Sequence, residues 1–85
     1  MPIDILYFAW VREAIGQGSE RVDPPADVTT VAALIDWLAV RGGGYATAFE
    51  NRDRLRTAVD QVFVPLDTGL VGAREVAIFP PVTGG

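Results

Sequence analysis

The residues of this chain with the clearest chemical potential are its last two, Gly84 and Gly85, which carry the terminal carboxylate. A carboxylate is normally inert toward nucleophiles because its oxygen is a poor leaving group. It reacts after another enzyme activates it, for example as an acyl-adenylate. Glycine lacks a Cβ, so this end can enter a narrow channel that larger residues would block. A chance pair of glycines is the alternative interpretation. We expect Gly85 to be the reacting residue and Gly84 to give an activating enzyme access to it.

The segment before the glycines has the composition of an extended arm. Pro80 and Pro81 cannot donate to a sheet ladder and favour extended backbone, so we expect the chain to leave its sheet there. At about 3.1 Å per extended residue, the six residues after Phe79 reach roughly 18 Å into a partner. Val82 and Thr83 would offer that partner backbone hydrogen bonds and modest side-chain contacts.

The composition excludes several kinds of active site. The 85 residues include neither cysteine nor histidine, so a thiol nucleophile, the usual general base and the commonest metal ligand are all missing. With 49% hydrophobic residues the chain can still build a core, and its length suits a single domain. We expect no enzyme activity from the chain on its own, and no cofactor or metal bound by the chain itself.

The sequence contains no signal for a membrane or for export. No apolar run approaches the roughly 20 residues that a helix needs to span a bilayer. The start, Met1-Pro2-Ile3-Asp4, has no basic residue ahead of its apolar stretch, unlike a signal peptide. We therefore predict a cytoplasmic protein without membrane partners.

The charge of the chain narrows its possible partners. A net charge of −4 argues against nucleic acid, whose phosphates require a basic patch. Acidity suits docking onto a basic protein groove, although acidity alone favours simple solubility as its explanation. All seven basic residues are arginines, so no lysine amine of this chain can attack an activated C-terminus, although drift toward arginine is the plainer explanation.

The expected order of elements is two strands, one helix and three further strands. Runs of β-branched and aromatic residues predict strands at 3–10, 19–23, 57–59, 62–64 and 75–79. A helical turn is expected at 11–15. Asp60 and Gln61 have the spacing of a tight turn between two strands. In the loop at 66–72, Leu70 and Val71 are the predicted packing anchors.

The clearest helix follows Thr29 or Thr30, either of which can cap it. Its apolar side chains recur at helical spacing and predict a core-facing stripe of Val31, Leu34, Ile35 and Leu38. Glycines at 42–44 are expected to stop it. Residues 45–54 are ambiguous and include a short helical stretch. Nearby, Arg52, Arg54 and Arg56 form a basic cluster, more often typical of a solvated face than of an anion site.

This order of elements predicts an α+β fold of the β-grasp, or ubiquitin-like, architecture. The helix supplies the crossover that a parallel strand pair requires, which places the first and last strands together in the centre. One main helix then packs on one face of a mixed sheet, and the other face stays open. We expect this domain to span residues 1–79 and a flexible Gly-Gly tail to follow at 80–85.

Aromatic residues mark the predicted open face. Phe8 and Phe79 each lie on the face of their strand that is opposite a row of other apolar side chains. The side chains on both faces of these strands cannot all be core. An exposed aromatic cluster usually marks an interface, and a second minor core beneath the loops is the alternative.

Several segments resemble the small, sulfur-carrier subunits of molybdopterin synthase. The resemblance runs the whole length, through Ile-Leu-Tyr-Phe-Ala-Trp-Val-Arg-Glu at 5–13 and Ala-Val-Asp-Gln at 58–61. Most of its specificity lies in Glu-Val-Ala-Ile-Phe-Pro-Pro-Val-Thr-Gly-Gly at 75–85. Asp60 departs from the asparagine expected in that family, which still permits the turn.

The resemblance implies a mechanism and a set of partners. An adenylating enzyme similar to ubiquitin-activating enzymes would use ATP and magnesium to adenylate Gly85. Sulfur from a persulfide donor would then displace AMP and produce a C-terminal thiocarboxylate. The tail would then enter the large subunit of the synthase and give sulfur to cyclic pyranopterin monophosphate, forming the dithiolene of molybdopterin. Such assemblies are heterotetramers. The resemblance also implies that Phe8, Phe63 and Phe79, with residues 80–83, bind the large subunit.

Other interpretations of the Gly-Gly end remain open. A carrier of the same architecture can serve thiamine, cysteine or thiolated-nucleotide synthesis. A ubiquitin-like modifier would instead be joined to lysines of target proteins. A plain interaction domain would lose nothing on removal of Gly84 and Gly85.

Overall fold

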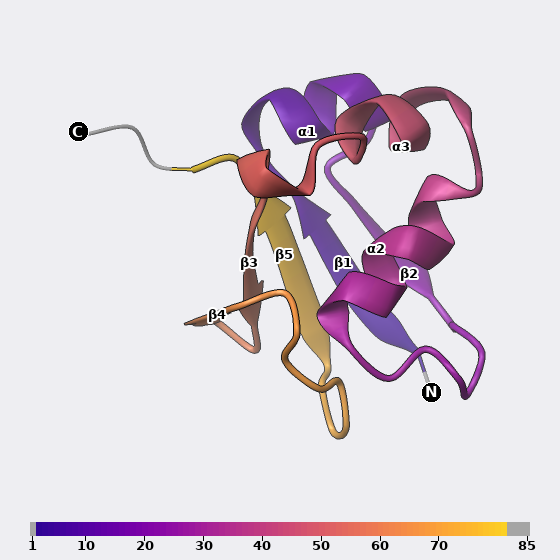
Figure 1. Cartoon of the computed structure of the whole chain (residues 1–85), viewed down its shortest axis with the longest axis vertical. Coiled ribbons are helices and arrows are strands. Elements are labelled where there is room, and N and C mark those ends of the chain that lie inside the picture. The colour runs from indigo at the N-terminus through magenta and orange to yellow at the C-terminus, as the bar shows by residue number, and fades with distance from the viewer. Residues whose placement is uncertain (1, 82–85) are drawn as a thin grey trace.

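The computed structural model describes residues 2–81, so the predicted residues Val82, Thr83, Gly84 and Gly85 lie outside the described part. Five strands form one sheet in the order β2-β1-β5-β3-β4 (Figure 1). Their bounds are β1 Ile3–Tyr7, β2 Ser19–Val22, β3 Arg56–Val59, β4 Val62–Val64 and β5 Glu75–Phe79. The proposed division at residue 79 stays a prediction.

The two central strands run parallel, as the sequence predicts. β1 and β5 pair with Ile5 opposite Val76 and Tyr7 opposite Ile78. Their neighbours, β2 and β3, pair antiparallel to them, and β4 pairs antiparallel to β3. The sheet is therefore mixed, and β1 and β5 end at the same edge of it.

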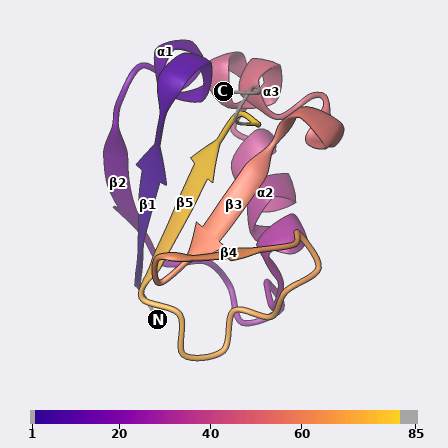
Figure 2. The ribbon, with the colours of Figure 1, turned by 90° about the vertical axis from the view of Figure 1, so that its left-hand side faces the viewer.

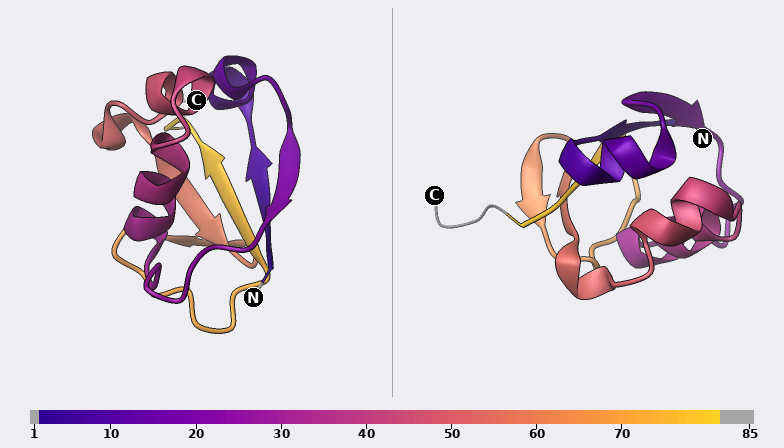
Figure 3. Two further views of the ribbon diagram at one scale, coloured as in Figure 1. Left: turned by 90° about the vertical axis from the view of Figure 1, so that its right-hand side faces the viewer. Right: turned by 90° about the horizontal axis from the view of Figure 1, so that it is seen from above.

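Helices cover one face and one end of the sheet. Their bounds are α1 Ala9–Ile15, α2 Val31–Ala39 and α3 Gly43–Ala48, followed by the 3-10 turn η1 Arg52–Arg54. The longest, α2, crosses one face, while α1 and α3 lie side by side where β1 and β5 end (Figures 1 and 3). The arrangement confirms the predicted β-grasp architecture with one main helix on one face.

The predicted core stripe of α2 is confirmed. Thr30 caps the helix, because its Oγ1 accepts a hydrogen bond of 3.1 Å from the Ala33 amide. The stripe packs against the inward-facing side chains of the sheet. The largest fully buried side chains are those of Tyr7, Phe49, Ile5, Leu34, Ile35, Leu38, Leu55, Ile78, Val11, Val31 and Val76.

The first strand is shorter than its composition predicts. Phe8 is still extended, but Ala9 adopts a positive φ of 53°, which turns the chain out of the sheet. The prediction of a strand to Trp10 is therefore wrong, and Ala9 and Trp10 belong to α1. Aromatic and β-branched residues suit both a strand and a buried helix face, so composition alone could not locate this turn.

Two predictions about loops also need correction. Leu70 is buried and anchors its loop, but Val71 is 99% exposed and anchors nothing. The glycines at 42–44 do follow the end of α2, yet Gly44 is also part of α3. A Cβ on Gly44 would lie 2.0 Å from the carbonyl oxygen of Ala14, so only glycine lets α3 pack this closely on α1.

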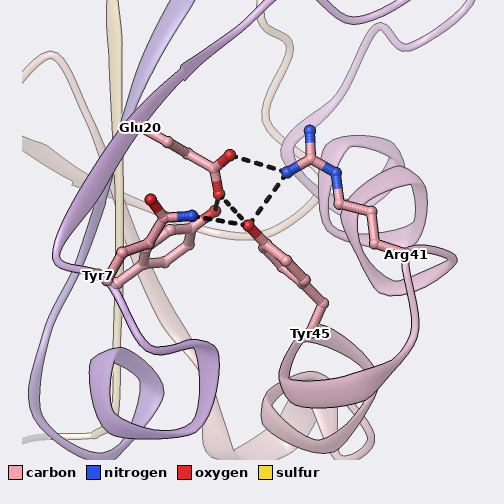
Figure 4. A network of polar contacts seen from close by, with 5 residues as sticks. Tyr7, Glu20, Arg41 and Tyr45 are labelled. Carbon is pink, nitrogen blue, oxygen red and sulfur yellow. Dashed lines mark hydrogen bonds and ion pairs between the residues drawn. The ribbon is translucent and has the colours of Figure 1, made fainter.

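A polar network ties β1, β2 and the region after α2 together (Figure 4). The Glu20 carboxylate accepts hydrogen bonds of 2.8 Å from the Tyr7 hydroxyl and 2.5 Å from the Tyr45 hydroxyl. Arg41 donates to Glu20 at 2.8 Å and to the Tyr45 oxygen at 3.1 Å. Each polar group in this cluster thus has a partner, which lets the Tyr7 hydroxyl lie inside the core.

The network shifts the pKa values of Glu20 and Tyr7. Burial raises the pKa of Glu20, but hydrogen bonds from Tyr45, Arg41 and Tyr7 outweigh it and hold that pKa below the ordinary 4.5. Burial and the neighbouring Glu20 carboxylate both raise the pKa of Tyr7, which stays a neutral donor.

We expect Glu20→Gln to lower the free energy of unfolding at pH 7 by about 1–3 kcal/mol, because charge-assisted hydrogen bonds are lost. A carboxyl with a lowered folded pKa stabilises the fold above its unfolded pKa and ceases to do so as the pH falls through the folded pKa. The variant should therefore lose less stability than wild type below about pH 4.5. Urea unfolding from pH 7 to pH 3 tests this, with the exposed Glu50→Gln as the charge-matched control. Equal acid dependence of Glu20→Gln and wild type would contradict the assignment.

The turn between β3 and β4 is clamped to the start of β5. Asp60 has a positive φ of 49°, a conformation that aspartate and asparagine tolerate better than most residues. Its Oδ1 accepts 3.0 Å hydrogen bonds from the amides of Arg74 and Glu75. A single side-chain oxygen makes both bonds, so the aspartate performs the same task as the asparagine expected from the resemblance.

We expect Asp60→Asn to change the free energy of unfolding by less than about 0.5 kcal/mol, because it keeps both the acceptor oxygen and the tolerance of positive φ. Asp60→Ala removes both and should cost about 1–2 kcal/mol. Chemical denaturation of the two variants measures the difference. Equal stability of the alanine variant and wild type would show that the clamp contributes nothing.

Candidate functional site

The face of the sheet opposite α2 is open. Side chains alternate between the faces, so the strand register decides which residues share a face. Ala58 of β3 lies opposite Ala77 of β5 and Phe63 of β4, and Leu6 of β1 lies opposite Ala77 on the other side. Figure 2 looks onto this face, and within residues 2–81 no helix covers it.

A groove of about 830 Å³ runs along this face to the start of the tail. The small side chains of Ala58 and Ala77 form its floor and leave room between the larger ones. Its lining consists of Leu6, Phe8, Ala9, Ala58, Gln61, Phe63, Glu75, Ala77, Phe79, Pro80 and Pro81. The groove is therefore an apolar surface that stays in contact with water.

The predicted aromatic residues gather around this groove. Phe8 is 47% exposed and Phe63 is 77% exposed, which is unusual for side chains of this size. The rings of Phe63 and Phe79 lie 5.5 Å apart between centroids, at 46° to each other. Together with Pro80 and Pro81, these residues place five of the predicted site residues on one surface.

Sequence reasoning found the aromatic residues and missed the floor beneath them. Phe8 and Phe79 were assigned to the outer face by alternation, while Phe63 was assigned by resemblance alone. The positions of Ala58 and Ala77 were readable as small residues at outward-facing sites of two predicted strands. What was missing was the register that puts them side by side beneath Phe63.

Charged side chains lie at both ends of the open face. At the end where β1 begins, Asp4 lies opposite Glu75, and the Arg21 guanidinium is hydrogen-bonded to Asp4 and lowers the pKa of that carboxyl. At the end where β5 stops, Arg56 lies opposite Phe79. The open face thus has Asp4, Glu75 and the paired Arg21 at one end, and Arg56 beside the tail.

The described part of the chain supplies no metal site. In residues 2–81, no group of three or more histidine, cysteine, aspartate or glutamate side chains is placed to hold a metal ion. Most of the described lining of the groove is apolar, and Glu75 contributes a carboxylate to it.

None of the helices between residues 2 and 81 has the length and apolar character that crossing a membrane requires.

A β-grasp domain with an open apolar face and a Gly-Gly end defines the class of ubiquitin-like carrier proteins. Within that class, the chain belongs to the ThiS family, whose model matches residues 5–85. Together with the curated relatives, this family assignment confirms the resemblance found in the sequence.

Curated relatives match nearly the whole chain. The molybdopterin synthase sulfur carrier subunit of Escherichia coli is 43% identical over 98% of this chain and 99% of its own length. The Haemophilus influenzae protein of the same name is 36% identical with the same coverage. Among solved structures, small archaeal modifier protein 1 of Haloferax volcanii has a TM-score of 0.69 at 27% identity, covering 95% of this chain and 98% of that one.

Proposed function

We propose that this chain is the sulfur-carrier subunit of a molybdopterin synthase. The observation that carries the proposal is the gathering of Phe8, Phe63 and Phe79 around one apolar groove at the base of the tail. Such a surface is costly to leave in water and suits a partner that also receives the tail. The names of the curated relatives support the same function.

In the first step of the proposed cycle, a partner enzyme activates the tail. The Gly85 carboxylate attacks the α-phosphorus of magnesium-bound ATP, which forms an acyl-adenylate and releases pyrophosphate. Sulfur from a persulfide donor then attacks the acyl carbon and displaces AMP. Reductive cleavage of the resulting acyl disulfide by a thiol leaves a thiocarboxylate on Gly85. ATP and magnesium belong to the partner, and this chain contributes the acyl group.

In the second step the loaded tail enters the large subunit of the synthase. The thiocarboxylate sulfur is transferred to cyclic pyranopterin monophosphate, and hydrolysis returns the Gly85 carboxylate. A dithiolene contains two sulfur atoms, so two loaded carriers are consumed for each product. The complete enzyme is then a heterotetramer with one carrier at each end, and the carrier alone is not an enzyme.

The residues of this chain position the reacting end. Because Pro80 and Pro81 line the groove directly after β5, docking of the groove also determines where the tail enters the partner. Tight contact at Phe8 and Phe63 would exclude water around that entrance. The predicted cytoplasmic location agrees with the use of ATP by the activating enzyme.

A second candidate is a ubiquitin-like protein modifier. The likeness to small archaeal modifier protein 1 favours it, because that protein shares the fold along nearly its full length. The two candidates share adenylation and differ in the fate of the acyl group, which ends as a thiocarboxylate in a carrier and as an isopeptide in a modifier.

We expect the protein isolated from cells that contain its sulfur-transfer partners to carry sulfur at Gly85. Replacing one oxygen by sulfur adds about 16 Da, which equals the mass of one oxidation. The single methionine of the sequence is Met1, so a C-terminal fragment without it separates the two changes. Intact-mass and fragment spectra make the measurement. Isopeptide-linked tails without any thiocarboxylate would favour the modifier instead. As a control, the Gly85→Leu variant should fold normally yet gain no sulfur.

We expect Phe8→Ala to weaken binding to the large subunit by about 2 kcal/mol, the effect of a hot-spot residue. The stability of the free chain should fall by less, because this side chain is half exposed. Titration calorimetry and thermal unfolding measure the two quantities. Val71→Ala removes an exposed apolar side chain outside the groove and serves as the control. Affinity unchanged in Phe8→Ala would remove this residue from the interface.

A further inference from the structure

Arg56 lies directly beside the base of the tail. It pairs with Phe79 in the β3–β5 register, one residue before Pro80. With Phe63 and Phe79 it lines a second hollow, of about 470 Å³, that adjoins the groove. The side chain is exposed, so a partner that covers the aromatic residues also meets this guanidinium.

The guanidinium of Arg56 is held in one orientation by its own backbone neighbourhood. Its Nη1 donates to the carbonyl oxygens of Asp53 at 3.0 Å and Leu55 at 2.8 Å. An arginine has five N–H donors, and these two bonds use both donors of Nη1. The Nε and Nη2 groups have no acceptor within residues 2–81. They form the side of the guanidinium that binds a carboxylate through two parallel hydrogen bonds.

In another arginine of this chain, the Nε and Nη2 groups bind a carboxylate. Arg21 donates from Nε to Asp4 Oδ1 at 2.8 Å and from Nη2 to Asp4 Oδ2 at 3.3 Å. Arg41 and Arg52 also pair with carboxylates. Arg56 has no such partner in the described residues, although the chain contains eleven acidic residues. Its neighbour Arg54 instead stacks 5.3 Å from the centroid of the Trp10 ring.

We propose that Arg56 binds an aspartate or glutamate of the synthase large subunit at the rim of the channel that receives the tail. The proposal rests on the proposed function and adds a specificity-determining residue to it. A carboxylate held through Nε and Nη2 would fix the angle at which the sheet docks, since the paired bonds are directional. The aromatic contacts would provide the affinity, and these paired bonds would determine the orientation in which the two proteins dock.

The length of the tail argues for a protein carboxylate over a substrate phosphate. When residues 80–85 are extended into a partner, Gly85 stands roughly 18 Å beyond Phe79, at about 3.1 Å per residue. Arg56 stays beside Phe79, so it faces the entrance of the channel and not the reaction centre. The group that it meets there belongs to the surface of the partner.

The test uses the full chain with the large subunit of the same organism, and compares Arg56→Lys with Arg74→Lys. Both variants keep the positive charge and lose the guanidinium, and Arg74 lies just before β5 at the end of the strand away from the tail. We expect Arg56→Lys to raise the Kd by about tenfold and Arg74→Lys to leave it unchanged. Arg56→Glu should raise the Kd further and reverse part of its salt dependence.

Thermal unfolding of each variant confirms that it is folded before binding is measured. A Kd for Arg56→Lys equal to that of wild type overturns the proposal. If Arg56→Lys leaves the Kd unchanged and also raises the KM for ATP in the activation reaction, the proposal is overturned and Arg56 is assigned to a phosphate. If wild type itself does not bind the large subunit, the proposed function fails, and that result is distinct from a failure at Arg56 alone.

Discussion

The parallel pairing of β1 with β5 is the constraint on which the rest of this molecule depends. Parallel strands end at the same edge of a sheet, so the chain leaves β1 and β5 side by side. Phe8 follows directly after β1 and donates its amide hydrogen to the Ile78 carbonyl oxygen at 3.2 Å. That bond sets Phe8 level with Phe79, and the tail begins at the next residue. The proposed docking surface and the proposed reactive end are thereby joined by one strand.

The two faces of the sheet have separate tasks. The face toward α2 contains the fully buried side chains and provides most of the stability. The opposite face has a floor of two alanines, and its exposed rings contribute less to the fold because water still reaches them. This division lets the proposed binding surface be apolar without disrupting the core. The Glu20 network acts on the covered side, where it holds β2 and α3 in place away from the groove.

Local patterns allowed much of the fold to be predicted. The stripe on α2 and its Thr30 cap depend on spacing within one turn of helix, and both were correct. The predicted turn at Asp60 was also correct, since its residue types suit positive φ. The end of β1 was predicted wrongly because it depends on the backbone of Ala9, a residue type that gives no warning of left-handed geometry. Val71 was misjudged because hydrophobicity does not reveal which side of a loop faces the core.

For the site, the sequence by itself determined the chemistry that we propose, which is activation of a Gly-Gly carboxylate that follows two prolines in a chain without cysteine or histidine. It also determined which residues of each strand share a face, because alternation is a property of the single strand. Only the tertiary structure decided which strands are neighbours and in what register. That pairing gathers Phe8, Phe63 and Phe79 over Ala58 and Ala77, and leaves one side of Arg56 open beside the tail. The physical reason is that register arises from hydrogen bonds between segments far apart in the chain.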